Sequence, residues 1–407
     1  MPRNRSLVGL ISAELVSLTG SAMTFVALPW FVLATTGSTV KMGWVLAAEM
    51  LPIAIVGIPA GSVIARFGAK RTMLVSDAAR GPLMLVIPIL HSSGHLSFGA
   101  LLGVTFAIGV FTAPYFASAR IVIPEIAGED EHAVAQVNAV LAGAQQITQI
   151  AGPVLAGLLI AATSPSTVLV VDGCTYVFSF LTILLVVHAG RRVAATDESH
   201  GLFAGLRFLM RDPLLGPTMI VACALNFVVQ GILIGVQALA FFRYDADAKV
   251  LGYLFGAFGV GALCGAVVAQ QLARKADLLR LAAFAIVAMP LPLYLLAVPL
   301  PWALSGLVVG AFAFFSPLVN APLAGVLTVR TPEALRAKVI TAVFTVATIA
   351  GPLGFLAAGE ALRYVSLSTF FLVLSTLMTI GALAFAAVLL RNSSAPAVTS
   401  VPDVAPG

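Results

Sequence analysis

The chain of 407 residues is 60% hydrophobic and only 10% charged, and its mean hydropathy is +1.06. Soluble domains carry about 25% charged residues, so this composition excludes a water-soluble globular protein. The formal net charge of +5 does not indicate nucleic-acid binding, because the basic residues lie in short loops rather than on one face.

Apolar runs long enough to cross a bilayer, which takes about 20 residues, follow one another along the chain. They lack the apolar/polar alternation of barrel strands, and backbone groups in hydrocarbon must be paired internally, so the runs predict helices. The first run is too long for a secretion signal and is interpreted as a retained helix. The boundary between the ninth and tenth spans has the weakest support, because only Pro299 and Pro301 mark a turn there. The twelve predicted spans are 7–34, 42–64, 72–91, 96–122, 134–162, 167–188, 214–242, 250–272, 278–299, 301–327, 338–360 and 366–390.

The basic residues predict the orientation of these spans. Of the 22 Lys and Arg residues, 17 fall on the side of the N-terminus, one (Arg80) lies within a span, and four fall on the other side: Lys41, Arg243, Lys249 and Arg363. Cytoplasmic loops carry an excess of Lys and Arg, so both termini are expected in the cytoplasm of a multi-pass cell-membrane protein.

The longest polar interval divides the chain into equal halves. We therefore expect a six-helix bundle in residues 1–190, a cytoplasmic linker in 191–212, a second bundle in 213–391 and a disordered tail in 392–407. The linker contains an amphipathic stretch, Leu202 to Leu209, that fits a helix on the membrane surface. The tail is rich in Ser, Ala, Pro and Val without periodicity.

Two sequence patterns recur in both halves. Gly57 and Gly61 recur as Gly261 and Gly265 at an offset of 204 residues, and Gly152-Pro153 recurs as Gly351-Pro352 at an offset of 199. Transporters are commonly built from repeats with the substrate site at their interface. Two matches at about the same offset favour an internal duplication.

Several short strings follow one another along the chain: Ala27-Leu28-Pro29-Trp30, Ser76-Asp77 with Arg80, Ile123-Pro124-Glu125 with Asn138, Val171-Asp172, Gly201-Leu202 with Arg211-Asp212-Pro213-Leu214-Leu215, and Leu335-Arg336-Ala337-Lys338-Val339. In their order and spacing they resemble the macrolide- and multidrug-efflux branch of the major facilitator superfamily. The resemblance covers nearly the whole chain. It implies a fold of twelve transmembrane helices in two pseudo-symmetric bundles, a monomer, and export of small molecules in exchange for protons.

The loop between the second and third spans is similar to the superfamily's gate loop, with one departure. The glycines Gly61 and Gly68 permit a tight turn, and the basic residues of the pattern are present as Arg66, Lys70 and Arg71. Ala65 stands where relatives have an acid that is thought to latch the two bundles, and Ala337 replaces a glycine common in the second-half echo of this loop. The departure at Ala65 puts the usual gate in doubt but not the fold.

Acidic residues within spans are costly in hydrocarbon and need an explanation. Glu14 lies seven residues, or about 10 Å, beyond Leu7, and Glu49 lies at a similar depth in the second span. Burial favours the protonated form of a carboxyl group, which suits proton exchange between the two sides. Glu14 and Glu49 are the candidates for proton coupling, although Glu14 could instead reach the cytoplasmic surface.

Asp77 and Arg80 are three residues apart and share a helical face, so they are interpreted as a structural charge pair. Asp172, near the end of the sixth span, is expected to form structural hydrogen bonds. Candidate substrate-cavity residues are amides on shared helical faces: Gln145, Gln149, Asn226, Gln230 and Gln237. Amides at this depth also join helices, which is the alternative interpretation.

The fifth span contains Gly152, Pro153 and Gly157, which resemble the Gly-Pro motif that the superfamily's antiporters carry on this helix. Pro153 removes one backbone donor and kinks a helix, and the glycines allow a neighbouring helix to pack closely. An ordinary proline kink is the alternative, because Gly351-Pro352 repeats the pair.

The sequence lacks the motifs of nucleotide binding, of zinc proteases and of metal sites. The sequence has no GxxxxGK[ST] loop and no HExxH motif, so we predict neither an enzyme nor a cofactor. His91 and His95 are four apart without acidic neighbours, and we expect no metal site. The leading hypothesis is a proton-driven exporter of an apolar or cationic organic compound, with membrane lipid and protons as partners. A facilitator or importer of a metabolite, and a non-transporting scaffold or sensor, remain alternatives.

Overall fold

The computed structural model describes residues 2–127, 131–187, 206–272, 277–331 and 335–391. The predictions for the centre of the linker, including most of the amphipathic stretch, and for the tail lie outside the described residues. All regular structure in the described ranges is helical.

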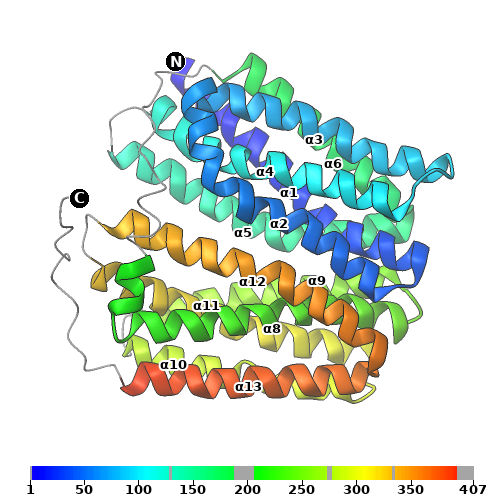
Figure 1. Cartoon of the computed structure of the whole chain (residues 1–407), viewed down its shortest axis with the longest axis vertical. Helices are drawn as coiled ribbons and strands as arrows, with labels where there is room; N and C mark the ends of the chain where they lie inside the picture. Colours follow the sequence, from blue (N-terminus) through cyan, green and yellow to red (C-terminus); the bar gives the residue numbers. More distant parts are fainter. Residues whose placement is uncertain (1, 128–130, 188–205, 273–276, 332–334, 392–407) are drawn as a thin grey trace. The chain divides into compact units, whose positions relative to one another are not determined.

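The described residues of the first half form six long helices (Figure 1): α1 (Pro2–Thr36), α2 (Thr39–Phe67), α3 (Ala69–Ser92), α4 (Phe98–Ala127), α5 (Glu131–Ala162) and α6 (Pro165–Leu185). Gly37 and Gly68 adopt φ of +62° and +85°, a conformation that favours glycine, and these residues end α1 and α2. The Ser38 and Ser164 side chains cap α2 and α6 by accepting hydrogen bonds from the amides of Lys41 and Thr167.

The described part of the second half includes the helices α8 (Leu215–Phe242), α9 (Ala248–Leu272), α10 (Leu278–Ala288), the 3₁₀ helix η1 (Leu291–Ala297), α11 (Trp302–Arg330), α12 (Arg336–Tyr364) and α13 (Leu367–Arg391). The ninth predicted span is divided into α10 and the 3₁₀ helix η1, because Pro290 and Pro292 cannot donate backbone hydrogen bonds. The predicted boundary between the ninth and tenth spans, marked only by Pro299 and Pro301, is present, since η1 ends at Ala297 and α11 begins at Trp302.

Eleven segments in the described residues are long and apolar enough to cross a membrane, and α12 is not among these eleven. The segment Leu278–Ala297 combines α10 and η1 into one of them. The predicted fold class, an all-α membrane protein, is confirmed. The chain is a multi-pass membrane protein.

Contacts divide the chain into two compact units that do not coincide with its two halves. The first unit comprises residues 1–196, 233–256 and 351–367, and the second comprises 197–232, 257–350 and 368–407. Within the first unit, α1 contacts α2, α4, α5 and α6, and α3 packs on both α4 and α6. The core of this bundle is apolar around Leu10, Met73 and Val122. The predicted division into two six-helix bundles stays a prediction.

Glycines bring the second-half segments of the first unit against its first-half helices. A Cβ atom at Gly43 would collide with the carbonyl oxygen of Phe355, and one at Gly157 would collide with the backbone of Gly252. The Thr39 hydroxyl donates a 2.9 Å hydrogen bond to the carbonyl oxygen of Gly359. The backbones of α2 and α12, and of α5 and α9, therefore lie in direct contact.

The C-terminal end of the linker is fixed within the second unit. Phe208 and Leu209 are buried in a cluster with residues of α8 and α12. Asp212 caps α8, since its Oδ1 accepts 2.9 Å hydrogen bonds from the amides of Leu214 and Leu215. This contact gives the Asp212-Pro213-Leu214-Leu215 string a structural function.

Gly261 and its counterpart Gly57 have different surroundings. In the second unit, Gly261 and Gly265 lie against the backbone carbonyls of Gly310 and Phe314 on α11. Gly57, the counterpart of Gly261, has open space where a Cβ atom would stand. The sequence repeat therefore does not produce the same packing in both halves.

This difference predicts a contrast between two matched substitutions. We expect Gly261→Leu to lower the free energy of unfolding by about 1–3 kcal/mol, because the side chain would separate α9 from α11. Gly57→Leu, the control, should leave stability almost unchanged. Thermal denaturation in detergent, followed by size-exclusion chromatography, measures both. Equal losses in the two variants would contradict the close packing at Gly261.

Candidate functional site

One arginine lies at the centre of a buried polar cluster in the first unit. Arg80 on α3 is 2% exposed, and its guanidinium carbon lies 4.1 Å and 4.4 Å from the ring centroids of Tyr115 and Tyr176. Its Nη2 atom donates a 2.5 Å hydrogen bond to Oδ1 of Asp77. Two aromatic faces and one carboxylate thus hold the cation, an arrangement that stabilises a desolvated guanidinium.

Asp77 is held from a second helix as well. Its Oδ2 accepts a 2.7 Å hydrogen bond from the Ser179 hydroxyl on α6. The Ser179 oxygen lies 3.3 Å from the Tyr115 hydroxyl on α4. The predicted pair of Asp77 and Arg80 is therefore part of a network that joins α3, α4 and α6.

Asp172 on α6 is fully buried and accepts two hydroxyl hydrogen bonds. Thr24 on α1 donates to Oδ2 at 2.6 Å, and Thr175 donates to Oδ1 at 3.1 Å. Gly20 makes the approach of α6 to α1 possible, because a Cβ atom there would collide with Asp172 Oδ1. Asp172 has the hydrogen bonds expected of a structural residue.

The two predicted coupling carboxyls are less fully paired. Glu14 on α1 is 4% exposed, and Glu49 on α2 is half-buried. Neither forms an ion pair within the described ranges. Glu14 Oε1 and Glu49 Oε2 are buried and have no hydrogen-bond partner among the described residues.

The charges of this cluster do not balance. Glu14, Asp77 and Asp172 interact electrostatically with the single guanidinium of Arg80, and Glu49 interacts with Asp172. One positive charge cannot neutralise four carboxylates, and unpaired buried charge is expensive. The cluster is therefore suited to bind protons or a cationic ligand.

The predicted substrate amides are not brought together in one described cavity. Gln145 and Gln149 on α5 are exposed, and Asn226 and Gln230 on α8 are half-buried. Gln237 on α8 is fully buried, and both of its amide atoms lack a partner in the described part of the chain. Asn226 and Gln230 belong to the second unit and the other three to the first. Their common function stays a prediction.

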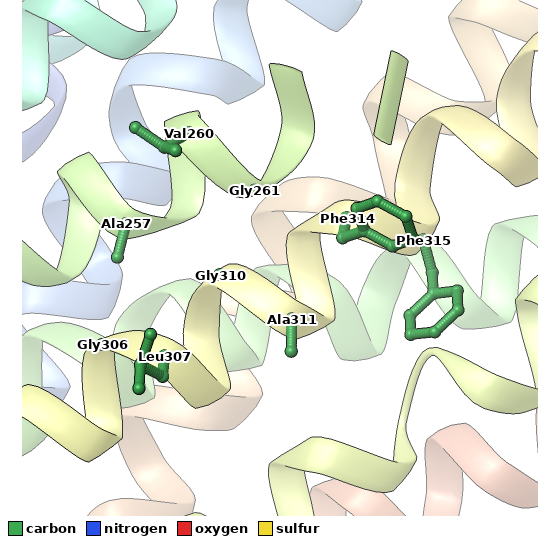
Figure 2. A pocket seen from close by; sticks show the side chains of 9 residues that line it. All are labelled: Ala257, Val260, Gly261, Gly306, Leu307, Gly310, Ala311, Phe314 and Phe315. Atoms are coloured by element: carbon green, nitrogen blue, oxygen red, sulfur yellow. The ribbon is translucent and has the colours of Figure 1, made fainter. Parts of the chain in front are cut away.

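An apolar groove of about 470 Å³ lies in the second unit between α9 and α11 (Figure 2). Gly261 and Gly310, whose backbones are in contact, line it together with Val260, Leu307 and Phe314. Leu307 is 65% exposed. None of the predicted amides or acids lines this groove, and its composition suits contact with hydrocarbon.

The residues of the predicted gate loop surround the short turn between α2 and α3. Gly61 lies within α2, and Gly68 takes the positive φ between the helices. Arg66 and Arg71 are exposed, while Lys70 Nζ donates a 3.4 Å hydrogen bond to the carbonyl oxygen of Leu184. Ala65, at the position of the missing acid, is half-buried.

The glycines of the predicted kink motif face two different helices. Gly152 packs against Ala22 of α1, whereas Gly157 packs against Gly252 of α9. The helix α5 continues through Pro153. No group of three or more potential metal-binding side chains occurs in the described residues, and the His91 ring packs on Phe31.

The sequence interpretation missed the hydroxyl residues of the cluster. Tyr115, Tyr176, Ser179 and Thr24 are unremarkable in apolar spans, since single hydroxyl groups occur in many membrane helices. One signal was available: Asp172, Tyr176 and Ser179 are spaced four and three residues apart, so they share a face of α6. That face turns toward Arg80 and Asp77.

A multi-pass helical bundle with a buried cluster of ionisable residues is typical of membrane transporters. Comparison with known proteins agrees: the profile of the Major Facilitator Superfamily matches residues 10–355. The chain belongs to this family. It is a membrane transporter of small molecules, not an enzyme, and the scaffold alternative is wrong.

Similar proteins include two called multidrug efflux pump Tap. The protein from Mycolicibacterium fortuitum is 28% identical over 91% of this chain and 92% of its own length. The one from Mycobacterium tuberculosis (strain ATCC 25618 / H37Rv) is 27% identical over 90% of this chain and 89% of its own. Among solved structures, the nucleoside transporter NupG has a TM-score of 0.75 at 12% identity, covering 94% of this chain and 98% of that chain. This last similarity concerns the fold alone.

The buried arginine predicts a large effect of one substitution. Arg80→Gln leaves the Asp77 carboxylate buried without its cation, and removing one partner of a buried ion pair costs about 3–5 kcal/mol. Arg280→Gln is a matched control, because Arg280 forms a 3.5 Å pair with Asp277 at the same spacing of three residues but is 80% exposed. It should cost less than about 1 kcal/mol. Denaturation of the purified variants compares the two, and similar losses would contradict the importance of burial.

Proposed function

We propose that this transporter exports small apolar or cationic organic compounds in exchange for protons, with Glu14 and Glu49 as the coupling groups. The observation that supports the proposal most strongly is the excess of carboxyl groups around Arg80. Unpaired carboxyl oxygens on Glu14 and Glu49 offer sites for a proton or for a cation. A carboxyl group that binds either a proton or a cationic substrate, but not both at once, can couple the movement of one to the opposite movement of the other.

The direction of transport is inferred from two observations. The similar proteins from M. fortuitum and M. tuberculosis are called multidrug efflux pumps. Gly152, Pro153 and Gly157 on α5 resemble the motif of the superfamily's antiporters, and Gly157 packs directly on the backbone of Gly252. A contact without side chains suits two helices that must close tightly against leakage.

The substrate class follows from the chemistry of the candidate residues. Carboxyl groups attract cations, and amides such as Gln237 form hydrogen bonds with neutral or charged organic molecules. We place the substrate cavity among Gln145, Gln149, Asn226, Gln230 and Gln237. A drug or a secreted metabolite with an apolar body and a positive or neutral polar group fits this set.

The proposal includes the protein's place in the cell. The excess of Lys and Arg on the side of the N-terminus favours a place in the cytoplasmic membrane with both termini in the cytoplasm. The monomeric state is proposed from the resemblance to the superfamily. We further propose that residues 1–190 and 213–391 work as two six-helix bundles joined by the linker at 191–212.

Proton coupling predicts the behaviour of neutral variants. Replacing Glu14 or Glu49 by Gln keeps the shape of the side chain but removes its ability to bind a proton. In everted vesicles with an acidic interior, we expect accumulation of ethidium to fall to the level without a gradient, while passive exchange of a neutral substrate persists. Accumulation of the dye is measured by fluorescence.

Two outcomes would contradict this proposal. Full accumulation in Glu14→Gln, Glu49→Gln and the double variant would reject coupling through these residues. Uptake of compounds from a broad panel by right-side-out vesicles, with none by everted vesicles, would reject export.

Orientation has a separate test that needs no substrate. Single cysteines are introduced at Gly68, Ser199 and Ser164 of a variant without Cys174, Cys223 and Cys264. We expect Ser164→Cys to react with a membrane-impermeant maleimide in intact cells, and the other two only after the cytoplasm is opened. Labelling of Ser199→Cys from outside would overturn the arrangement of two bundles with a cytoplasmic linker.

A further inference from the structure

We propose that a pocket at one end of the first unit binds the phosphate of an anionic phospholipid, and that the bound lipid stabilises the contact between α2 and α12. The pocket has a volume of about 400 Å³ and lies where α1 ends, α2 begins, and α8 and α12 end. This is the outer end in the proposed orientation. The inference goes beyond the proposed function, because it concerns a lipid and not the exported compound.

Two basic side chains from distant parts of the sequence line this pocket. Lys41 belongs to the first turn of α2, and Arg363 belongs to the last turn of α12. The sequence places four of its 22 Lys and Arg residues on this predicted side of the membrane. Two of these four line the same pocket, so positive charge is concentrated there.

The nearby carboxylates do not neutralise both cations. Lys41 forms no ion pair within the described residues, and its ammonium nitrogen lies 5.4 Å from the centre of the Phe98 ring. Arg363 pairs with Glu360 at 3.5 Å, and the two side chains are 63% and 45% exposed. An exposed ion pair of this kind is weak. The pocket therefore keeps an excess of positive charge, which complements an anion.

The remaining surface of the pocket fits a lipid better than a free phosphate ion. Val40, Phe242 and Leu362 place apolar surface beside the two cations, and Phe242 is 55% exposed. Trp44, one turn along α2 from Lys41, is 50% exposed, and tryptophan is enriched where a membrane meets water. We infer that the pocket lies at the level of the headgroups, where anionic lipids attract basic side chains.

A phosphate bound by Lys41 and Arg363 together joins two segments that already touch. The Thr39 hydroxyl, which also lines the pocket, donates a 2.9 Å hydrogen bond to the carbonyl oxygen of Gly359. One turn further along α2, Gly43 lies against the backbone of α12. A ligand that binds better to the joined arrangement than to the separated one shifts the protein toward it, so the lipid stabilises this contact.

The first experiment uses Trp44 to measure lipid binding without a substrate. The chain has three tryptophans, so Trp30→Phe and Trp302→Phe leave Trp44 as the only one. This full-length protein is reconstituted in equimolar vesicles of phosphatidylcholine and phosphatidylglycerol, with brominated acyl chains on one lipid or the other. Quenching of Trp44 fluorescence gives the relative affinity for each lipid. We expect a preference of about fivefold for phosphatidylglycerol.

Lys249 provides a matched control, because it is an exposed cation on the same predicted side and does not line the pocket. We expect Lys41→Gln and Arg363→Gln to reduce the preference by half or more, and Lys249→Gln and Lys41→Arg to retain it. Equal quenching by both lipids, or equal losses in the three glutamine variants, would overturn the proposal. So would a change in Trp44 fluorescence on addition of inorganic phosphate without any preference between the lipids.

The second experiment tests the contact between α2 and α12 by amide hydrogen exchange. The full chain in a neutral detergent receives phosphatidylglycerol or, as the control, phosphatidylcholine. We expect phosphatidylglycerol to slow exchange about threefold in peptides covering residues 37–43 and 359–365, and to leave peptides from α13 unchanged. The slowing should be lost in Lys41→Gln and Arg363→Gln and retained in Lys249→Gln.

Uniform slowing along the chain, or none in these two peptides, would overturn stabilisation of the contact by the lipid. Neither experiment measures transport or depends on which end of the bundle is outside. Failure of proton-coupled export therefore leaves the lipid site standing, and failure of the lipid site leaves the proposed function untouched.

Discussion

The placement of Arg80 is the interaction on which the interior of the first unit depends. A guanidinium at membrane depth is stable only with partners, and here they come from three helices: Asp77 on its own helix, Tyr115 on α4 and Tyr176 on α6. The cation in turn makes it possible to bury Asp77 and to bring Asp172 and Glu14 close by. A bundle of apolar helices thereby contains a polar centre that still has more carboxyls than cations.

The fold was largely predictable because each transmembrane helix is one continuous apolar run of the sequence, so that hydrophobicity alone locates it. All twelve predicted spans correspond to described helices, and even the short turn at Pro299 and Pro301 is present. The division of the ninth span at Pro290 was not predicted, since a proline within an apolar run does not reveal whether a helix bends or ends. The unequal packing of Gly57 and Gly261 also escaped the sequence, because identical spacing does not determine which helix lies opposite.

The candidate site was predictable only in part. Charged residues in apolar spans are conspicuous, so Glu14, Glu49, Asp77, Arg80 and Asp172 were all noticed. Of their connections only the pair of Asp77 and Arg80 was predicted. The links to other helices were not, because these depend on Tyr115 and Ser179, whose hydroxyl groups contribute only when α4 and α6 lie beside α3. The charge excess could have been counted from the sequence, but its concentration around one arginine required the structure.

The contact between Gly43 and Gly359 has a mechanical consequence. Where two helices meet through side chains, separation requires interlocked groups to leave their rotamers, and each such group adds resistance. At Gly43 and Gly359 the backbones of α2 and α12 themselves are in contact, and the Thr39 hydroxyl donates a hydrogen bond to the carbonyl oxygen of Gly359 beside them. At such a crossing the helices can approach closely, and few side-chain rotamers oppose their separation.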